Sequence, residues 1–194
     1  DSKHDRFQLV YKLPESEVKG RPIPVSYGFI DTNNVVWLCN EDALYLYNTN
    51  TQKVILIKNE IGESITDIAQ IDATHYFIGT DVGIHYATLN SNSLMLSPCP
   101  KLDTLKIQIN EIFYHQLSNK VFIGTFQRGM YVYLMHLDAG LMDVSINCIR
   151  SFNPDEILIA TDGAGVYKMN TKTYNCIPYI IADYNRYNAM NGNT

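Results

Sequence analysis

Short apolar segments alternate with polar turns along the whole chain, and no segment keeps the 3.6-residue period of an amphipathic helix. A typical unit is residues 76–89, YFIGTDVGIHYATL. In it, an apolar stretch ending in Gly-Thr is followed by a short polar loop, a glycine and a second apolar stretch. Strand-length apolar segments separated by turns rich in Asn, Asp, Ser and Thr are typical of antiparallel sheets. The pattern therefore predicts an all-β protein.

The same unit occurs in three further places. Residues 121–134 read VFIGTFQRGMYVYL, residues 157–170 read ILIATDGAGVYKMN, and residues 35–48 read VVWLCNEDALYLYN, with Cys39 in the Thr place and Ala43 in the Gly place. The anchor residues of the four copies are 36 to 45 residues apart: Cys39, Thr80, Thr125 and Thr161. An apolar stretch begins 14 to 16 residues before each anchor, at Val25, Ile65, Ile109 and Ile146. Four short strands in about 40 residues are the signature of a propeller blade.

We therefore expect a β-propeller arc of about four four-stranded blades, a fragment of a larger ring of about six to eight blades. Within this single propeller segment, 1–194, the blades are expected at 24–63, 64–108, 109–145 and 146–182, with the end of a preceding blade at 1–23 and the lead into a following blade at 183–194. The third copy has 17 residues from Gly129 to Ile146, against 26 from Gly83 to Ile109. This blade is expected to have lost a turn or most of its outer strand.

The amino-acid composition argues against certain classes of binding partner. With 46% hydrophobic and 18% charged residues, the chain is typical of a packed globular protein. Its net charge is −5 and it has no basic stripe, so nucleic acids and anionic membrane surfaces are poor partners. No apolar run approaches the roughly 20 residues that cross a bilayer, so no membrane segment is expected in this chain.

The cysteines and histidines indicate neither a metal site nor a catalytic site. The four cysteines lie far apart without CxxC pairs, so we expect free thiols, with one structural disulfide as the alternative: Cys39, Cys99, Cys148 and Cys176. No zinc-ligand spacing, GxSxG, HExxH or phosphate-binding glycine loop occurs. We therefore expect no metal, no cofactor and no catalytic residue.

The loops between anchor and glycine carry the candidate binding residues. A propeller brings these loops together at one mouth of its axis, where directed polar groups over an apolar floor would suit a sugar. Solvated loop tips are the alternative interpretation of the same residues: Glu41, Asp42, Asp81, Gln127, Arg128 and Asp162. The threonines that end the second strands are expected to bond to neighbouring backbone rather than to a ligand.

An Ile-x-x-Ile strand, a polar turn, a strand ending in Ile-Gly-Thr or Ile-Ala-Thr, and then Gly-aromatic-x-aromatic recur in phase over about residues 24–194. This pattern resembles the two-component regulator propeller repeats, which occur in the extracytoplasmic sensor regions of hybrid two-component systems of gut Bacteroides-type bacteria. NAMNGNT at 188–194 is similar to the Asn-x-Leu-x-x-Asn segment that opens a repeat there. The departures are Cys39, Ala43, the short third copy and a single tryptophan, Trp37.

The resemblance implies a periplasmic part of an inner-membrane sensor that recognises a glycan fragment and controls a remote histidine kinase. It also implies a homodimer of the parent protein, and an arc could pair through an uncovered blade face. Phosphotransfer would belong to other parts of the parent, so this segment would not be an enzyme.

Two other functions stay open at this point. Propellers that inactivate streptogramins are lyases that use a metal and a histidine near the axis, and His85, close to a motif glycine, would be the residue to test. Alternatively, the arc could serve as a plain protein-interaction platform.

Overall fold

The computed structural model describes residues 25–40, 43–58, 61–90, 93–97, 106–133, 135–137, 141 and 143–181. These residues form four antiparallel four-stranded sheets, and in each sheet the strands follow one another in chain order. The first sheet contains β1 (Tyr27–Ile30), β2 (Val35–Cys39), β3 (Ala43–Asn48) and β4 (Lys53–Lys58). The second sheet contains β5 (Ile65–Gln70), β6 (His75–Thr80), β7 (Ile84–Asn90) and β8 (Ser93–Ser97).

The two remaining sheets continue the same meander. The third sheet contains β9 (Ile109–His115), the 3-10 turn η1 (Gln116–Ser118), β10 (Lys120–Thr125), β11 (Met130–Val132) and β12 (Met135–Leu137). The fourth sheet contains β13 (Ile146–Asn153), β14 (Glu156–Thr161), β15 (Val166–Asn170) and β16 (Cys176–Ile180). Each sheet falls inside one of the four blade ranges expected from the repeat.

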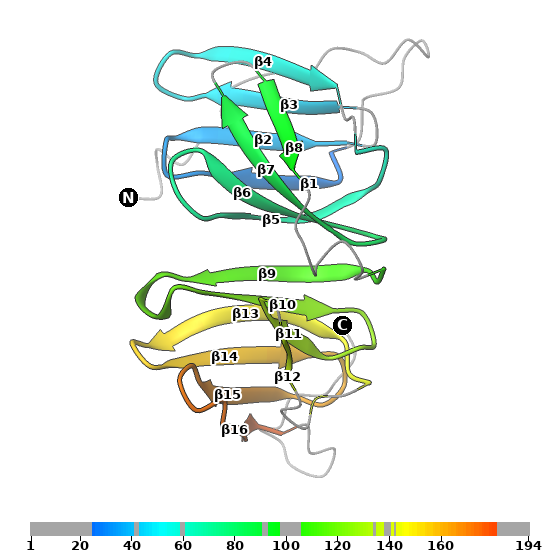
Figure 1. Cartoon of the computed structure of the whole chain (residues 1–194), viewed down its shortest axis with the longest axis vertical. Helices are drawn as coiled ribbons and strands as arrows, with labels where there is room; N and C mark the ends of the chain where they lie inside the picture. Colours follow the sequence, from blue (N-terminus) through cyan, green and yellow to red (C-terminus); the bar gives the residue numbers. More distant parts are fainter. Residues whose placement is uncertain are drawn as a thin grey trace, which may run out of the picture.

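The first strand of each sheet lies at the centre of the arc. Strand β1 lies against β5, β5 against β9, and β9 against β13. In Figure 1, β4 and β16 lie at opposite ends of the molecule, whereas β5 and β9 lie in the middle. Sheets that share a line of inner strands in this way are the blades of a propeller. The predicted all-β propeller arc is therefore confirmed.

Three apolar interfaces hold consecutive blades together. The interface between the first two blades is built on Trp37, Leu44, Ile65, Ile68, Tyr76 and Ile78. That between the second and third is built on Phe77, Ile84, Ile109, Ile112 and Ile123. That between the third and fourth is built on Phe122, Met130, Ile146, Ile149, Ile157 and Met169. Burial of these side chains is the main favourable contribution to packing, since single strands cannot bury an apolar face alone.

The glycine of the Ile-Gly-Thr motif is where the next blade approaches most closely. A Cβ atom on Gly79 would lie 2.8 Å from Cγ2 of Ile109, and one on Gly124 would lie 2.6 Å from Cγ2 of Ile146. Real Cβ atoms do not approach that closely, so only glycine fits without movement of the neighbouring side chain. The motif therefore encodes blade packing.

The strand register corrects the sequence alignment of the first blade. Tyr27 pairs with Cys39, as Asp67 pairs with Gly79, so Cys39 occupies the glycine position and not the threonine position. Asn40 takes the threonine position: its N–H donates to Ala43 O at 3.0 Å, and its Oδ1 accepts from Ala43 N at 2.6 Å. With Asn40 as the anchor, the distance from Val25 is 15 residues, the same as from Ile65 to Thr80 and from Ile146 to Thr161.

The third blade is shortened in its outer half. Strands β11 and β12 have three residues each, whereas β7 has seven and β8 has five. The inner strand β9 keeps seven residues. The described outer strands of this blade are therefore short, whereas its inner strand is similar in length to the inner strands of the second and fourth blades.

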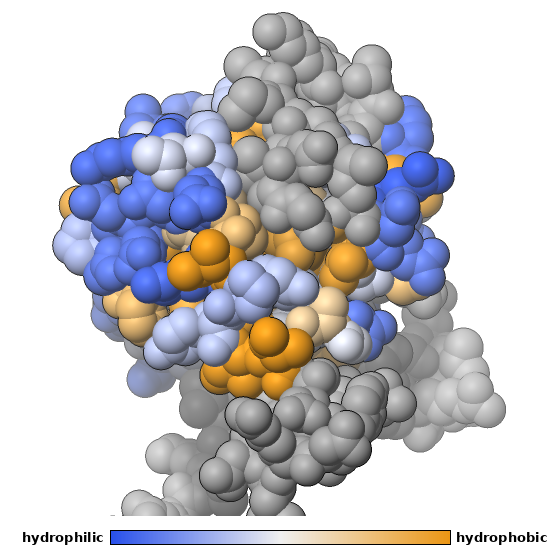
Figure 2. Space-filling model, turned by 90° about the horizontal axis from the view of Figure 1, so that it is seen from below, coloured by the Kyte–Doolittle hydropathy of each residue, from blue (hydrophilic) through white to orange (hydrophobic). Residues whose placement is uncertain are grey.

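The outward face of the fourth sheet carries exposed apolar side chains. Phe152, Ile177 and Tyr179 are 45%, 46% and 49% exposed, and the rings of Phe152 and Tyr179 lie 5.6 Å apart. The ammonium of Lys168 lies over the Phe152 ring. Figure 2, which looks at the molecule from this end, shows hydrophobic atoms exposed between hydrophilic ones.

Candidate functional site

The loops that follow the second strands are tied to the starts of the inner strands. The residue after each motif threonine donates its backbone N–H to the residue just before the inner strand: Asp81 N to Ser64 O at 3.1 Å, Phe126 N to Gln108 O at 3.0 Å and Asp162 N to Ser145 O at 2.9 Å. Because β5, β9 and β13 lie next to one another around the arc, the three loops lie at one mouth.

The motif threonines hold these loops in shape. The hydroxyls of Thr125 and Thr161 donate to the carbonyl of the loop glycine, to Gly129 at 2.7 Å and to Gly165 at 2.8 Å. The hydroxyl oxygen of Thr80 accepts from the N–H of its loop glycine, Gly83, at 3.0 Å. Thr80 and Thr125 are fully buried. The expected structural role of the threonines is confirmed.

The six sequence-predicted site residues fall into three groups. Glu41 and Asp42 lie outside the described residues. The carboxylate of Asp81 accepts a bond at 3.1 Å from the N–H of Ser64, the residue before the inner strand of the same blade. Asp162 is exposed, and neither residue lines the pocket described below. Only Gln127 and Arg128 are brought together around a common space: both line that pocket.

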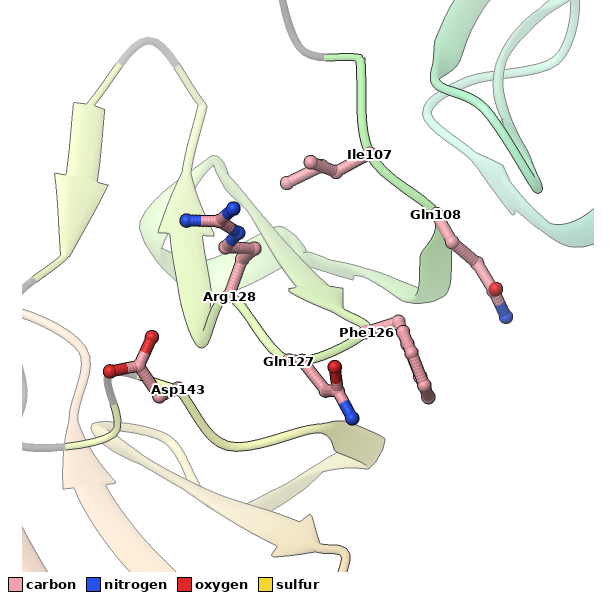
Figure 3. A pocket seen from close by; sticks show the side chains of 6 residues that line it. All are labelled: Ile107, Gln108, Phe126, Gln127, Arg128 and Asp143. Atoms are coloured by element: carbon pink, nitrogen blue, oxygen red, sulfur yellow. The ribbon is translucent and has the colours of Figure 1, made fainter.

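This pocket lies beside the loop of the third blade. It has a volume of about 510 Å³ and is lined by Ile107, Gln108, Phe126, Gln127, Arg128 and Asp143. In Figure 3, Arg128 and Ile107 extend to one side of the loop, and Phe126 and Gln108 to the other. Phe126 is 46% exposed, which is unusual for an aromatic ring in a polar loop. The pocket therefore combines an apolar surface with several polar groups.

Among the described residues, nothing neutralises the two charged groups of the pocket. Within the described residues, the side chains of Arg128 and Asp143 make no hydrogen bond or ion pair, and both are exposed. Gln127 has a positive φ of 54°, and its backbone N–H donates to Ser145 Oγ at 3.1 Å, which fixes the loop while leaving the amide side chain at the pocket. Arginine donors, carboxylate acceptors and amides can together bind a polyhydroxylated ligand.

Sequence reasoning missed four residues of the pocket. Phe126 was passed over because only polar loop residues were taken, although an aromatic ring stands there in place of Asp81 and Asp162 in the neighbouring copies. Ile107, Gln108 and Asp143 lie before the inner strands β9 and β13 rather than in the loop. No local pattern in the sequence marks them.

The equivalent mouth of the second blade contains a hydrogen-bonded cluster. Nε2 of His85 lies 2.8 Å from Oε2 of Glu63, and the hydroxyl of Thr80 donates to the same oxygen at 2.7 Å. Partial burial raises the pKa of Glu63, but the bonds from His85 and Thr80 outweigh it and hold the pKa below its usual value of 4.5. His85, the residue of the lyase alternative, is thus paired with one carboxylate. Among the described residues, no group of three or more His, Cys, Asp or Glu side chains could hold a metal ion.

Polar side chains of the inner strands connect one blade to the next near the axis. Tyr27, Asp67 and Glu111 occupy the same repeat position. The hydroxyl of Tyr27 donates to Asp67 and accepts from Ile68 N at 3.2 Å, and Asp67 in turn accepts from the backbone N–H of Ile112. Each side chain therefore reaches the inner strand of the following blade, which satisfies a backbone donor that would otherwise be buried unpaired.

Glu111 continues this series toward the fourth blade. It forms an ion pair with Arg150 and interacts with the backbone N–H of Ile149. Burial raises the pKa of Asp67 despite its hydrogen bonds, and burial together with the charge of Asp67 raises the pKa of Glu111. These groups join blades and do not line the pocket of the third blade.

The cysteines in the described residues are free thiols: Cys39, Cys148 and Cys176. Burial raises the pKa of Cys39 to about 12 and that of Cys176 to about 11, so both are poor nucleophiles at neutral pH. Cys99 lies outside the described residues.

Comparison with known proteins gives a match in structure only. No protein-family profile and no curated protein sequence matches the chain. The extracellular domain of BT3049 from B. thetaiotaomicron, described as a hybrid two-component system, aligns with a TM-score of 0.64 over 87% of this chain and 23% of its own, at 15% identity. Two structures of the extracellular domain of BT4673 from the same organism align with TM-scores of 0.66 and 0.65 over 94% of this chain, at 16% and 17% identity.

BT4673 is described as a one-component system in one of its structures and as a hybrid two-component system in the other. The chain spans about a quarter of the length of the domains it matches. The resemblance to extracytoplasmic sensor propellers is confirmed at the level of the fold. Within the described residues, no helix is long and apolar enough to span a lipid bilayer.

Proposed function

We propose that this chain is a ligand-recognition segment of an extracytoplasmic sensor propeller, and that the pocket of the third blade binds a glycan fragment. The observation that carries the proposal is that the exposed ring of Phe126 lines the same pocket as the side chains of Arg128 and Asp143, which have no partner among the described residues. The likeness to extracellular domains of two-component systems supports a periplasmic place in an inner-membrane sensor.

The chemistry of the pocket fits a sugar ring. A pyranose has an apolar face of C–H groups that can lie on an aromatic ring, and Phe126 offers such a surface. Its hydroxyls are both donors and acceptors, which the Asp143 carboxylate, the Arg128 guanidinium and the Gln127 amide complement. A pocket of about 510 Å³ is within the size range of small-ligand sites.

Signal transmission would follow from where the pocket lies. Phe126 and Arg128 belong to the loop of the third blade, whereas Asp143 lies in the connection into the fourth. A ligand that touches both favours one arrangement of the two blades over others, and this preference is what a sensor passes on. In this proposal the kinase reaction takes place elsewhere in a homodimeric parent protein, and this chain contributes recognition only.

Binding to a panel of plant and host oligosaccharides tests the proposal. Isothermal titration of the chain should identify at least one ligand, and Phe126→Ala should weaken its binding by about fivefold, because lost ring stacking costs about 1 kcal/mol. Leu117→Ala is the matched control, since Leu117 is 75% exposed at the opposite end of the same blade. Absence of binding across the panel, or equal loss in both variants, would overturn the proposal.

A further inference from the structure

We infer that the pocket of the third blade selects an uncharged saccharide over an acidic one, such as a uronate or a sulfated sugar. This inference rests on the proposed function and adds the charge class of the ligand. Its basis is the presence of Arg128 and Asp143, one cation and one anion, at the same pocket and without partners among the described residues.

Arg128 alone would favour an acidic ligand, because guanidinium binds carboxylate and sulfate with two parallel hydrogen bonds. Asp143 opposes this preference, since its carboxylate lines the same pocket and repels an anionic group held there. At about 4 Å in water such repulsion corresponds to roughly a fivefold weaker binding constant. The attraction and the repulsion therefore largely cancel.

The hydrogen-bonding capacity of Asp143 adds a second argument. An ionised carboxylate only accepts hydrogen bonds, and sugar hydroxyls can donate to it. A carboxylate or sulfate on the ligand has no donor, so it would displace water from Asp143 without replacing those bonds. An uncharged ring satisfies Asp143 and Arg128 together.

The charges around the pocket do not favour an anion either. Asp81 and Asp162 are exposed on the neighbouring mouth loops, and the whole chain carries a net charge of −5. Lys106 precedes Ile107 of the pocket, but it interacts with the carboxylate of Glu63 in the second blade. The surroundings therefore repel an acidic glycan as it approaches, an effect that salt screens.

Matched pairs of oligosaccharides test the inference. Each pair has one backbone in two forms: a uronate and its carboxyl-reduced counterpart, or a sulfated sugar and its desulfated counterpart. Titration of the chain at physiological ionic strength should give at least fivefold tighter binding of the uncharged member for every backbone that binds.

Asp143→Asn is the discriminating variant. Asp143 has a positive φ of 61°, a conformation that Asn also adopts readily, so the fold should be kept. The variant should bind the acidic member about fivefold more tightly than the natural chain does and should lose most of the selectivity, whereas Leu117→Ala should leave it unchanged. Tighter binding of the acidic member by the natural chain, or unchanged selectivity in Asp143→Asn, would overturn the inference and leave glycan recognition standing. If no member of any pair binds, the proposed function fails as well.

Discussion

The mouths of the second and third blades share one backbone design. In both, the hydroxyl of the motif threonine, Thr80 or Thr125, forms a hydrogen bond with the backbone of the loop glycine. In both, the next residue, Asp81 or Phe126, donates its N–H to the start of the inner strand. The loop of the third blade has one residue more between threonine and glycine.

The two mouths differ in which polar side chains already have hydrogen-bond partners. In the second blade Asp81 accepts from the N–H of Ser64, just before the inner strand, and Glu63 binds His85. In the third blade Ile107 stands in the place of Glu63, and Arg128 has no partner among the described residues. The comparison teaches that the repeat fixes the frame of every mouth, whereas a few substitutions decide whether its polar groups bind each other or remain available to a ligand.

Disturbing the close packing between blades should have the largest effect on stability. In Gly124→Ala the new Cβ would lie 2.6 Å from Ile146, so the free energy of unfolding should fall by about 2 kcal/mol through overpacking. Gly28→Ala is the control, because its Cβ would meet nothing closer than 3.9 Å, and fewer unfolded conformations should raise stability by about 0.5 kcal/mol. Urea denaturation measures both. Equal stability of the two variants would show that close approach at Gly124 is unimportant.

Exchanging one residue between the mouths should have the next largest effect. Phe126→Asp gives the third blade the residue that the second has at this position, and it should weaken binding of any identified glycan by at least about tenfold. The reverse change, Asp81→Phe, should add no second binding site, because Glu63 and His85 already pair at that mouth. Titration of both variants checks this prediction. A second binding site in Asp81→Phe would show that an aromatic ring alone is sufficient for binding.

The hydrogen-bonded cluster of Glu63, His85 and Thr80 should make a smaller, pH-dependent contribution to the free energy of unfolding. Glu63→Gln should lower the free energy of unfolding at pH 7 by about 0.5–1 kcal/mol, since the pair with His85 is partly exposed. The pKa of Glu63 is lowered in the folded chain, so its contribution is present above the usual value of 4.5 and is lost as the pH falls. Denaturation at pH 7 and pH 3 should show the difference from the natural chain shrinking at pH 3. A constant difference would contradict the assigned pairing.

The smallest expected effect is a difference in pKa between Glu63 at the mouth and Asp67 near the axis. Carboxyl NMR of the natural chain should show Glu63 titrating below its usual value of 4.5 and Asp67 above its usual value of 3.8, because burial dominates at the axis. Asp67 therefore favours folding less as the pH rises above 3.8, opposite in sign to Glu63. Shifts in the same direction would indicate that the two carboxylates have similar surroundings.

The repeat made most of the fold predictable. The alternation of apolar and polar residues and the recurrence of Thr80, Thr125 and Thr161 predicted the four sheets, the shortened third blade and the structural hydroxyls. The place of Cys39 was wrong by one residue, because Asn40 and not Cys39 stands at the threonine position, and the first copy has no threonine there to mark it. Of the candidate site, Gln127 and Arg128 line the pocket, whereas Phe126 and Asp143 were found only in the structure.

The sequence by itself determined the strands, their turns and their order, since these depend on neighbours a few residues apart and on a period repeated four times. Only the tertiary structure decided which groups meet. Asp67 binds the N–H of Ile112, and Arg128 faces the same pocket as Asp143, because rigid sheets pack face to face around an axis. Such packing brings together residues whose positions in the chain share no pattern. The strands and turns can therefore be predicted from neighbouring residues, whereas the residues of the site cannot.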